Sequence, residues 1–165
     1  MSKLLPKLYL DSVFHIDFET LKNQGITTLL FDLDNTIAAY EVPVADERVI
    51  EFFANLKEMG FFVCLVSNNR NERVLTYADS LDISYISFAK KPFKGGLLKA
   101  CAIFGSKPND CALIGDQVFT DVFGGNRLGM FTILVKPISP PAGFFIKQKR
   151  RLERMVLRRL KNNGQ

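Results

Sequence analysis

Two aspartates stand two positions apart at the end of an apolar run in this chain. The run covers residues 28–33 and contains Asp32, and Asp34 follows it directly. In an extended chain, positions two apart face the same side, so both carboxylates would stand at the end of a strand. Carboxylates this close repel each other unless a divalent cation lies between them, and Mg²⁺ takes one or two carboxylates together with phosphate oxygens. The spacing therefore predicts a magnesium and phosphate site, with an Asx turn that ends the strand as the alternative.

Polar groups follow three further predicted strands at the same point, immediately after the strand's carboxyl end. They are Ser67-Asn68-Asn69, Lys90-Lys91-Pro92 and Gly115-Asp116-Gln117. In open α/β sheets, ligands bind outside the carboxyl ends of the strands. Four strand ends that each offer phosphate or metal chemistry favour one shared site over four unrelated polar loops.

The elements that must position these residues are short apolar runs alternating with helical patterns. The predicted strands cover residues 28–33, 61–66, 83–88, 111–114 and 131–135. The predicted helices cover residues 49–56, 74–81, 97–102 and 119–128, with Asp46 and Gly60 as caps of the first and Gly105 ending the third. This alternation is typical of βα units, and it predicts an α/β fold with a parallel sheet.

Composition predicts one domain with its own core, since the chain has 165 residues of which 47% are hydrophobic. Cys64, Cys101 and Cys111 lie inside apolar segments without metal-ligand spacing, which indicates buried thiols in a reducing compartment.

No apolar run approaches the ~18 residues of a membrane span, and the first ten residues lack the apolar core of a signal peptide. We therefore expect a cytoplasmic protein. His15 is the single histidine, which argues against histidine-based metal sites or triads.

Positive charge is concentrated at the end of the chain. Residues 147–161 hold eight Lys or Arg and one Glu, a local balance of +7 within a total of +5, so the remainder carries −2. We accordingly divide the chain into a domain of residues 1–143 and a basic amphipathic helix in residues 144–165. Such a helix can lie on an anionic membrane, which would make the protein peripheral there; docking of its apolar side on the domain is the alternative. Nucleic acid is disfavoured as a partner because few aromatic residues lie among the basic ones.

The four motifs resemble those of the haloacid dehalogenase-like phosphatases. They are Asp-Leu-Asp-Asn-Thr, Ser-Asn-Asn, Lys-Lys-Pro and Gly-Asp-Gln-Val-Phe-Thr-Asp, in this order. The resemblance runs from about Leu5 to the basic tail, and it is strongest to the YqeG family of subfamily IIIA, in the subgroup that includes the phosphatidylglycerophosphatases. It implies a three-layer Rossmann-like fold around a central parallel sheet and a Mg²⁺-dependent phosphatase.

The resemblance also implies roles for the acidic residues. Asp32 would be the nucleophile that forms an aspartyl-phosphate, and Asp34 the general acid that later acts as the base. Mg²⁺ would be held by the Asp32 carboxylate, the Asp34 backbone carbonyl and Asp116. Asp121 would orient the lysine of the site or a metal-bound water, with capping of the following helix as the alternative.

Phosphate contacts follow from the same resemblance. Ser67 would donate to a phosphoryl oxygen with the assistance of the Asn68 amide, unless Ser67 serves as a helix cap. Lys91 would be the cation opposite the metal. Lys90 and Lys94 remain alternatives, because the ends of flexible side chains cannot be placed from sequence.

The spacing between motifs leaves no room for a large cap domain. Thirty residues separate Thr36 from Ser67 and twenty-three separate Ser67 from Lys91, and a helix and a strand use most of each interval. The open site that results suits a phosphate on a large carrier. The substrate expected first is phosphatidylglycerophosphate; nucleic-acid ends, phosphoproteins or a scaffold that binds phosphate without turnover are the alternatives. Retention of both Asp32 and Asp34 argues against the scaffold.

Overall fold

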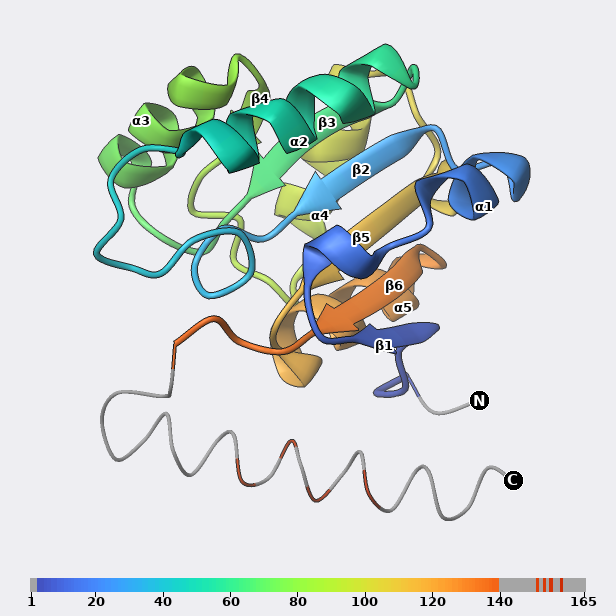
Figure 1. Ribbon diagram of the computed structural model, residues 1–165. Coiled ribbons are helices and arrows are strands. Elements are labelled where there is room, and N and C mark those ends of the chain that lie inside the picture. Colours follow the sequence, from blue (N-terminus) through green and yellow to red (C-terminus); the bar gives the residue numbers. More distant parts are fainter. Residues whose placement is uncertain (1–2, 140–150, 152, 154, 156–157, 159–165) are drawn as a thin grey trace.

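A computed structural model describes residues 3–139 and, beyond these, residues 151, 153, 155 and 158. Six parallel strands form one sheet in the order β1-β6-β5-β2-β3-β4. The strands are β1 (Leu8–Leu10), β2 (Thr28–Phe31), β3 (Phe62–Val66), β4 (Ser84–Ile86), β5 (Cys111–Gly115) and β6 (Phe131–Val135). Figure 1 shows the arrowheads of β2, β3 and β6 pointing toward one edge of the sheet.

Helices cover both faces of the sheet and complete three layers (Figure 1). They are α1 (Phe18–Asn23), α2 (Glu47–Glu58), α3 (Asn71–Leu81), α4 (Lys94–Ile103) and α5 (Phe123–Leu128), with single turns η1 (Val13–His15), η2 (Pro108–Asp110) and η3 (Val118–Val122). Successive residues of β2 serve opposite faces, because side chains alternate along a strand. Leu29 packs in the cluster that contains Phe53 of α2, whereas Leu30 packs with Leu97 of α4.

The predicted fold class is confirmed, and so are the caps. Asp46 accepts a hydrogen bond from the amide of Val49 at 2.9 Å and begins α2. Gly60 and Gly105 follow α2 and α4 with φ of 89° and 64°, a left-handed conformation that glycine adopts without strain. The three cysteines are buried and free, as their apolar surroundings indicated.

Several elements differ from the sequence prediction. β1, η1 and α1 were not predicted from sequence. β1 and η1 have three residues each and α1 has six, which is too few for a clear hydrophobic pattern. The predicted strand at residues 83–88 ends at Ile86, since Phe88 turns the chain with a φ of 47°. The predicted helix at residues 119–128 is divided into η3 and α5. The first predicted strand ends at Phe31, so Asp32 stands just beyond β2.

The topology places four loops at one edge of the sheet. β2 pairs with β3 on one side and with β5 on the other, so the direction in which the chain winds reverses beside β2. Ligand sites of open α/β sheets lie at such a reversal, outside the carboxyl ends of the strands. Between Thr36 and Ser67 the chain forms α2 and β3, and between Ser67 and Lys91 it forms α3 and β4. No cap domain is inserted in either interval.

Most of the predicted basic helix at residues 144–165 lies outside the described residues. Glu153 is helical and buried, and it accepts a long hydrogen bond of 3.5 Å from the amide of Phe119 in η3.

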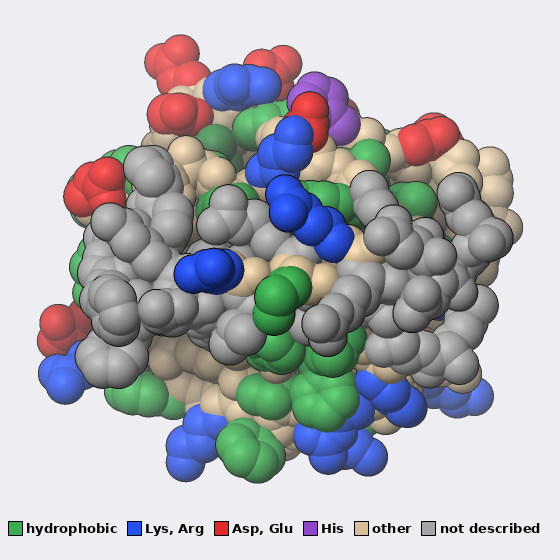
Figure 2. Space-filling model, turned by 90° about the horizontal axis from the view of Figure 1, so that it is seen from below, with side chains coloured by type: hydrophobic (Ala, Val, Ile, Leu, Met, Phe, Trp, Pro, Cys, Tyr) green, Lys and Arg blue, Asp and Glu red, His purple; other side chains and the backbone are tan. Residues whose placement is uncertain are grey.

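Figure 2 shows the molecule from below: hydrophobic side chains are intermixed with Lys and Arg along its lower edge, and most Asp and Glu lie toward the upper edge and the left side. Among the described residues, no helix has the length and apolar character needed to span a bilayer.

Candidate active site

The carboxyl ends of β2 and β5 bring three acidic residues together. These two strands are neighbours, and the amide of Asp32 donates to the carbonyl of Ile114 at 2.8 Å, one residue past the end of β2. Asp116 follows β5 directly, and Asp121 lies in η3. Carboxylate oxygens of Asp32, Asp116 and Asp121 lie within 4.8 Å of one another, and all three residues are buried. We call these three residues the carboxylate cluster.

The ammonium group of Lys91 contacts two members of the carboxylate cluster. Its Nζ lies 2.7 Å from Oδ1 of Asp32 and 2.7 Å from Oδ1 of Asp121, and the side chain is 1% exposed. Lys90 and Lys94, the two other candidates from sequence, are exposed. The structure therefore brings Lys91 to the acidic residues and leaves Lys90 and Lys94 at the surface.

Asn68 supports the backbone of Lys91 through both ends of its carboxamide. Its Nδ2 donates to the Lys91 carbonyl at 3.0 Å, and its Oδ1 accepts from the Lys91 amide at 2.7 Å. The amide of Ala89 also donates to the carbonyl of Ser67 at 2.9 Å, which joins the same two loops. Because the Asn68 side chain is engaged in this link, we expect any contact of Asn68 with substrate to come from its backbone amide.

Ser67 is buried at the end of β3 and is not a helix cap. Its Oγ accepts a hydrogen bond from the amide of Asn69 at 3.0 Å. α3 begins at Asn71, and its cap residue is Arg70, which makes no side-chain cap bond. Since the Ser67 hydroxyl acts as an acceptor in this contact, its proton is left to donate to a further acceptor such as a phosphoryl oxygen.

Asp34 faces a different set of partners from the carboxylate cluster. Its Oδ1 lies 2.7 Å from Nε of Arg73, and its Oδ2 accepts from Nδ2 of Asn69 at 3.2 Å. Arg73 also donates to the carbonyls of Val42 at 2.7 Å and Ala39 at 2.9 Å. Arg73 is not among the residues predicted from sequence, although it is a cation in the first turn of the helix that follows the Ser-Asn-Asn motif.

Asp121 is held against the end of β5. A Cβ atom at Gly115 would overlap the carboxyl group of Asp121, so the close approach requires glycine at this position. Oδ2 of Asp121 accepts from the amide of Gln117 at 3.1 Å. α5 begins at Phe123 after the cap residue Val122 and has no side-chain cap bond, so Asp121 does not cap that helix.

The electrostatics of the site are dominated by burial. Removal from water raises the pKa of Asp32 to about 7; the charge of Lys91 opposes this rise, and the carboxylates of Asp121 and Asp116 add to it. Burial would lower the pKa of Lys91, but the negative charges of Asp121 and Asp32 outweigh burial and raise it. Three carboxylates around one ammonium make an environment that favours a cation.

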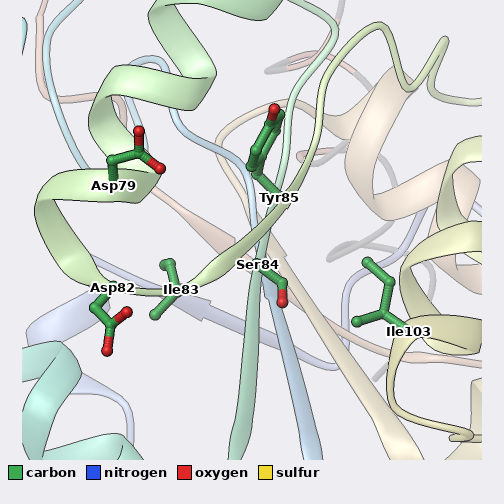
Figure 3. Close-up of a pocket in the computed structure, with 6 residues that line it drawn as sticks. All are labelled: Asp79, Asp82, Ile83, Ser84, Tyr85 and Ile103. Carbon is green, nitrogen blue, oxygen red and sulfur yellow. The ribbon is translucent and has the colours of Figure 1, made fainter.

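A separate pocket of about 630 Å³ lies away from these residues. It is lined by Asp79, Asp82, Ile83, Ser84, Tyr85 and Ile103. Figure 3 shows that these residues come from the end of α3, the start of β4 and the end of α4, and that the two carboxylates point in different directions. The chemistry at the carboxyl ends of β2 and β5 is absent from this pocket.

Comparisons with known proteins agree with the geometry of the site. A family model for haloacid dehalogenase-like hydrolases matches residues 7–129. The chain is 41% identical to the probable phosphatase YqeG of Bacillus subtilis (strain 168), over 97% of this chain and 93% of that protein. It is 28% identical to phosphatidylglycerophosphate phosphatase 1, chloroplastic/mitochondrial, of Arabidopsis thaliana, over 98% of this chain but 49% of that protein. The chain thus spans about half the length of the plant relative.

Solved structures agree on the fold. The cobalt-bound form of the deoxy-D-mannose-octulosonate 8-phosphate phosphatase (YrbI) from Haemophilus influenzae matches with a TM-score of 0.56 at 15% identity, over 83% of this chain and 90% of that one. At this identity the match shows the fold alone. Because the family model covers most of the chain and the Bacillus relative matches nearly its full length, the chain belongs to the haloacid dehalogenase-like hydrolases, among the phosphatases of the YqeG family.

Proposed function

We propose that the chain hydrolyses phosphomonoesters through an aspartyl-phosphate on Asp32, with Mg²⁺ as its cofactor and a lipid-borne phosphate as its substrate. One observation carries this proposal: the ammonium group of Lys91 lies 2.7 Å from both Asp32 and Asp121 inside the buried carboxylate cluster. A nucleophilic carboxylate beside a fixed cation suits attack on a phosphoryl group whose negative charge must be neutralised.

The residues present fit a divalent cation. The carboxylate cluster offers three buried acidic groups, and the single ammonium of Lys91 does not neutralise them. Hard oxygen ligands of this kind suit Mg²⁺. We propose that the carboxylates of Asp32 and Asp116 and the backbone carbonyl of Asp34 hold the ion. When bound, Mg²⁺ supplies positive charge that neutralises the phosphoryl oxygens.

The first chemical step forms the covalent intermediate. A carboxylate oxygen of Asp32 attacks phosphorus, an Asp32–phosphorus bond forms, and the bond from phosphorus to the leaving oxygen breaks. Asp34 donates its proton to that oxygen, so the product leaves as an alcohol. Ser67 and Lys91 hold the phosphoryl oxygens during the transfer.

The second step releases phosphate. Asp34, now a carboxylate, takes a proton from water, and the water oxygen attacks phosphorus as the bond to Asp32 breaks. Arg73 and Asn69 keep the two Asp34 oxygens apart from the carboxylate cluster in the resting structure. These contacts hold the Asp34 side chain in one orientation beside the loop that follows β2.

Two observations support a lipid-borne substrate. Neither described interval between the motifs, residues 37–66 or residues 68–90, contains a cap domain, and a site without such a cap suits a phosphate on a large carrier. Phosphatidylglycerophosphate phosphatases from Arabidopsis thaliana and Chlamydomonas reinhardtii match 98% and 99% of this chain at 28% identity. We therefore propose phosphatidylglycerophosphate as the substrate and a peripheral position at the membrane for the protein.

A substrate panel tests this proposal. Purified full-length protein is assayed with phosphatidylglycerophosphate in mixed micelles, glycerol 3-phosphate, p-nitrophenyl phosphate, a 5′-phosphorylated oligonucleotide and a phosphopeptide, each with Mg²⁺ and with a chelator. We expect the highest kcat/KM for the phospholipid, and no turnover with the chelator or in Asp32→Asn. A higher kcat/KM for the oligonucleotide or the phosphopeptide would contradict the lipid substrate, and no turnover of any ester would contradict the catalytic function.

A further inference from the structure

Four large apolar side chains are more than half exposed at the edge of the sheet that carries the candidate active site. Their exposed fractions are 62% for Tyr40, 55% for Phe88, 69% for Phe93 and 53% for Ile138. All four lie in segments that follow the carboxyl ends of β2, β4 or β6. We call these four residues the apolar rim.

Two members of the apolar rim flank the lysine of the site. The amide of Phe88 donates to the carbonyl of Asn69 at 3.1 Å, and Asn69 in turn contacts Asp34. The amide of Phe93 donates to the carbonyl of Lys90 at 2.8 Å, which closes a tight turn around Lys91. The backbones of both aromatic residues are therefore joined to the loops that hold the site residues.

The other two members are tied to the loop that follows Asp32. The amide of Ile138 donates to the carbonyl of Asn35 at 3.0 Å. The guanidinium of Arg73, which pairs with Asp34, lies 5.2 Å from the centre of the Tyr40 ring. All four members of the apolar rim thus contact residues of the catalytic loops or of α3, three of them through backbone hydrogen bonds and Tyr40 through its ring.

The loop at residues 88–94 separates inward from outward side chains. Ala89 and Lys91 are buried, whereas the aromatic and basic residues around them are exposed, namely Phe88, Lys90, Phe93 and Lys94. Phe88 and Lys90 have φ of 47° and 54°, a left-handed conformation that costs free energy for residues with a side chain. This strained loop exposes aromatic and basic side chains, and it also places Lys91 in the site.

Exposed cations occur in the segments that carry or contact Phe88 and Phe93. Arg70, Lys90 and Lys94 are exposed, and within the described part of the chain none of them forms an ion pair. Residues 83–94 contain three lysines and no carboxylate, and the exposed carboxylates of the neighbouring segments are Glu41, Asp46, Glu47 and Glu72. The balance around Phe88 and Phe93 is therefore positive, which complements an anionic surface.

We propose that the apolar rim and its neighbouring cations dock the protein on the anionic surface of a phospholipid bilayer, with the active site facing the lipid headgroups. Aromatic and aliphatic side chains with cations beside them are suited to the boundary between headgroups and acyl chains. The loops then enter that boundary while Lys91 stays beneath it, within reach of a headgroup phosphate. This inference rests on the proposed lipid substrate and assigns membrane contact to the domain itself, whatever residues 144–161 contribute.

The test uses a double variant designed to fold. Phe88→Asn places a residue that tolerates a left-handed φ at that position. Phe93 is the cap residue of α4 and makes no side-chain cap bond, so Phe93→Ser introduces a favourable helix cap. The matched control is Phe62→Ser, because Phe62 is 50% exposed but lies at the amino end of β3.

Binding is measured by sedimentation with vesicles of phosphatidylglycerol and phosphatidylcholine, at low salt and at about 0.5 M salt, where surface charges are largely screened. We expect the double variant to bind at least about tenfold more weakly than wild type at both salt concentrations, because the two substitutions remove two exposed aromatic rings. Phe62→Ser should bind within about twofold of wild type. Equal sedimentation of the double variant and wild type, equal weakening by the control, or no sedimentation of wild type would overturn the proposal.

Activity separates failure of docking from failure of the proposed function. With phosphatidylglycerophosphate in the same vesicles, the double variant should lose about tenfold in kcat/KM, whereas p-nitrophenyl phosphate turnover stays within about twofold of wild type. If wild type sediments with the vesicles, the double variant does so more weakly, and wild type hydrolyses only the soluble ester, the lipid substrate is refuted and docking stands. A double variant that hydrolyses vesicle-borne lipid as fast as wild type would refute docking while the lipid substrate stands.

Discussion

Arg73 and Asp34 form an ion pair of 2.7 Å between the first turn of α3 and the loop that follows β2. The same guanidinium donates to the carbonyls of Val42 and Ala39, so one side chain fixes both the proposed acid–base group and the loop beyond it. Arg73 is 15% exposed at its side chain, which limits screening by solvent. We infer that Arg73 is a positioning residue that acts through Asp34.

Replacement of Arg73 should slow the hydrolysis of phosphate esters to an extent that depends on the leaving group. Arg73→Gln frees the Asp34 carboxyl to adopt other orientations, and a misplaced general acid costs about 10²–10⁴-fold in rate. The loss in kcat should be large for glycerol 3-phosphate, whose leaving oxygen needs a proton, and at least about tenfold smaller for p-nitrophenyl phosphate. Steady-state kinetics with both esters test this, with Arg48→Gln on α2 as the control. Equal losses for the two esters would show that Arg73 has only a structural role.

Removal of Lys91 should destabilise the metal-free protein. Lys91→Met leaves three buried carboxylates without their cation, and loss of one partner of a buried ion pair costs about 3–5 kcal/mol. Chemical denaturation with a chelator should reveal this loss, and Mg²⁺ should recover part of it because the ion replaces the missing positive charge. Lys99→Met on the exposed side of α4 should stay within about 0.5 kcal/mol of wild type. A Lys91→Met protein as stable as wild type would contradict the buried ion pairs of Lys91 with Asp32 and Asp121.

Asp32 should make the metal-free protein less stable at higher pH. Its pKa is about 7 in the folded protein against 3.8 in the unfolded chain, so between these values the folded state binds the extra proton. Stability therefore falls as pH rises through this window. We expect the Tm of metal-free wild type to drop by about 5 °C or more between about pH 5 and pH 8, and Asp32→Asn to show a flatter profile. Parallel profiles for the two proteins would exclude Asp32 as the titrating group.

Gly115 should tolerate no larger residue. In Gly115→Ala, the new Cβ displaces the Asp121 carboxyl group and disturbs its ion pair with Lys91. We expect stability to fall by about 1–3 kcal/mol and kcat by about 100-fold or more. Gly95→Ala is the matched control, because no atom lies within 4 Å of its new Cβ and alanine favours the helix by about 0.5–1 kcal/mol. Normal kcat in Gly115→Ala would mean that Asp121 can move without consequence.

The strands and helices that build the site could be predicted from sequence because their signals are local. Asp46 and Gly60 mark the two ends of α2, and the apolar runs mark the central strands. β1 gave no comparable signal, since its three residues are stabilised as a strand by pairing with β6 rather than by a pattern of their own.

The side-chain partners in the site could be predicted only in part. The motifs indicated Asp32, Asp116 and the lysine loop, but the choice of Lys91 over Lys90 depends on the left-handed turn at Lys90. The contact of Arg73 with Asp34 joins positions that are 39 residues apart, and no spacing rule within one helix or strand reports such a pair. Tertiary contacts of this kind become visible only when the sheet order is known.

The central claim is that Asp32 carries the phosphoryl group during turnover. It is tested by acid quenching of the protein with p-nitrophenyl phosphate and Mg²⁺, followed by mass spectrometry of the peptide that contains Asp32. Asp34→Asn should accumulate more intermediate than wild type, because this leaving group needs no proton whereas the water of the second step needs a base. The account predicts a phosphoryl group on Asp32 in both proteins and none in Asp32→Asn. Phosphate release by wild type without any phosphorylated Asp32, or unchanged turnover by Asp32→Asn, would contradict it.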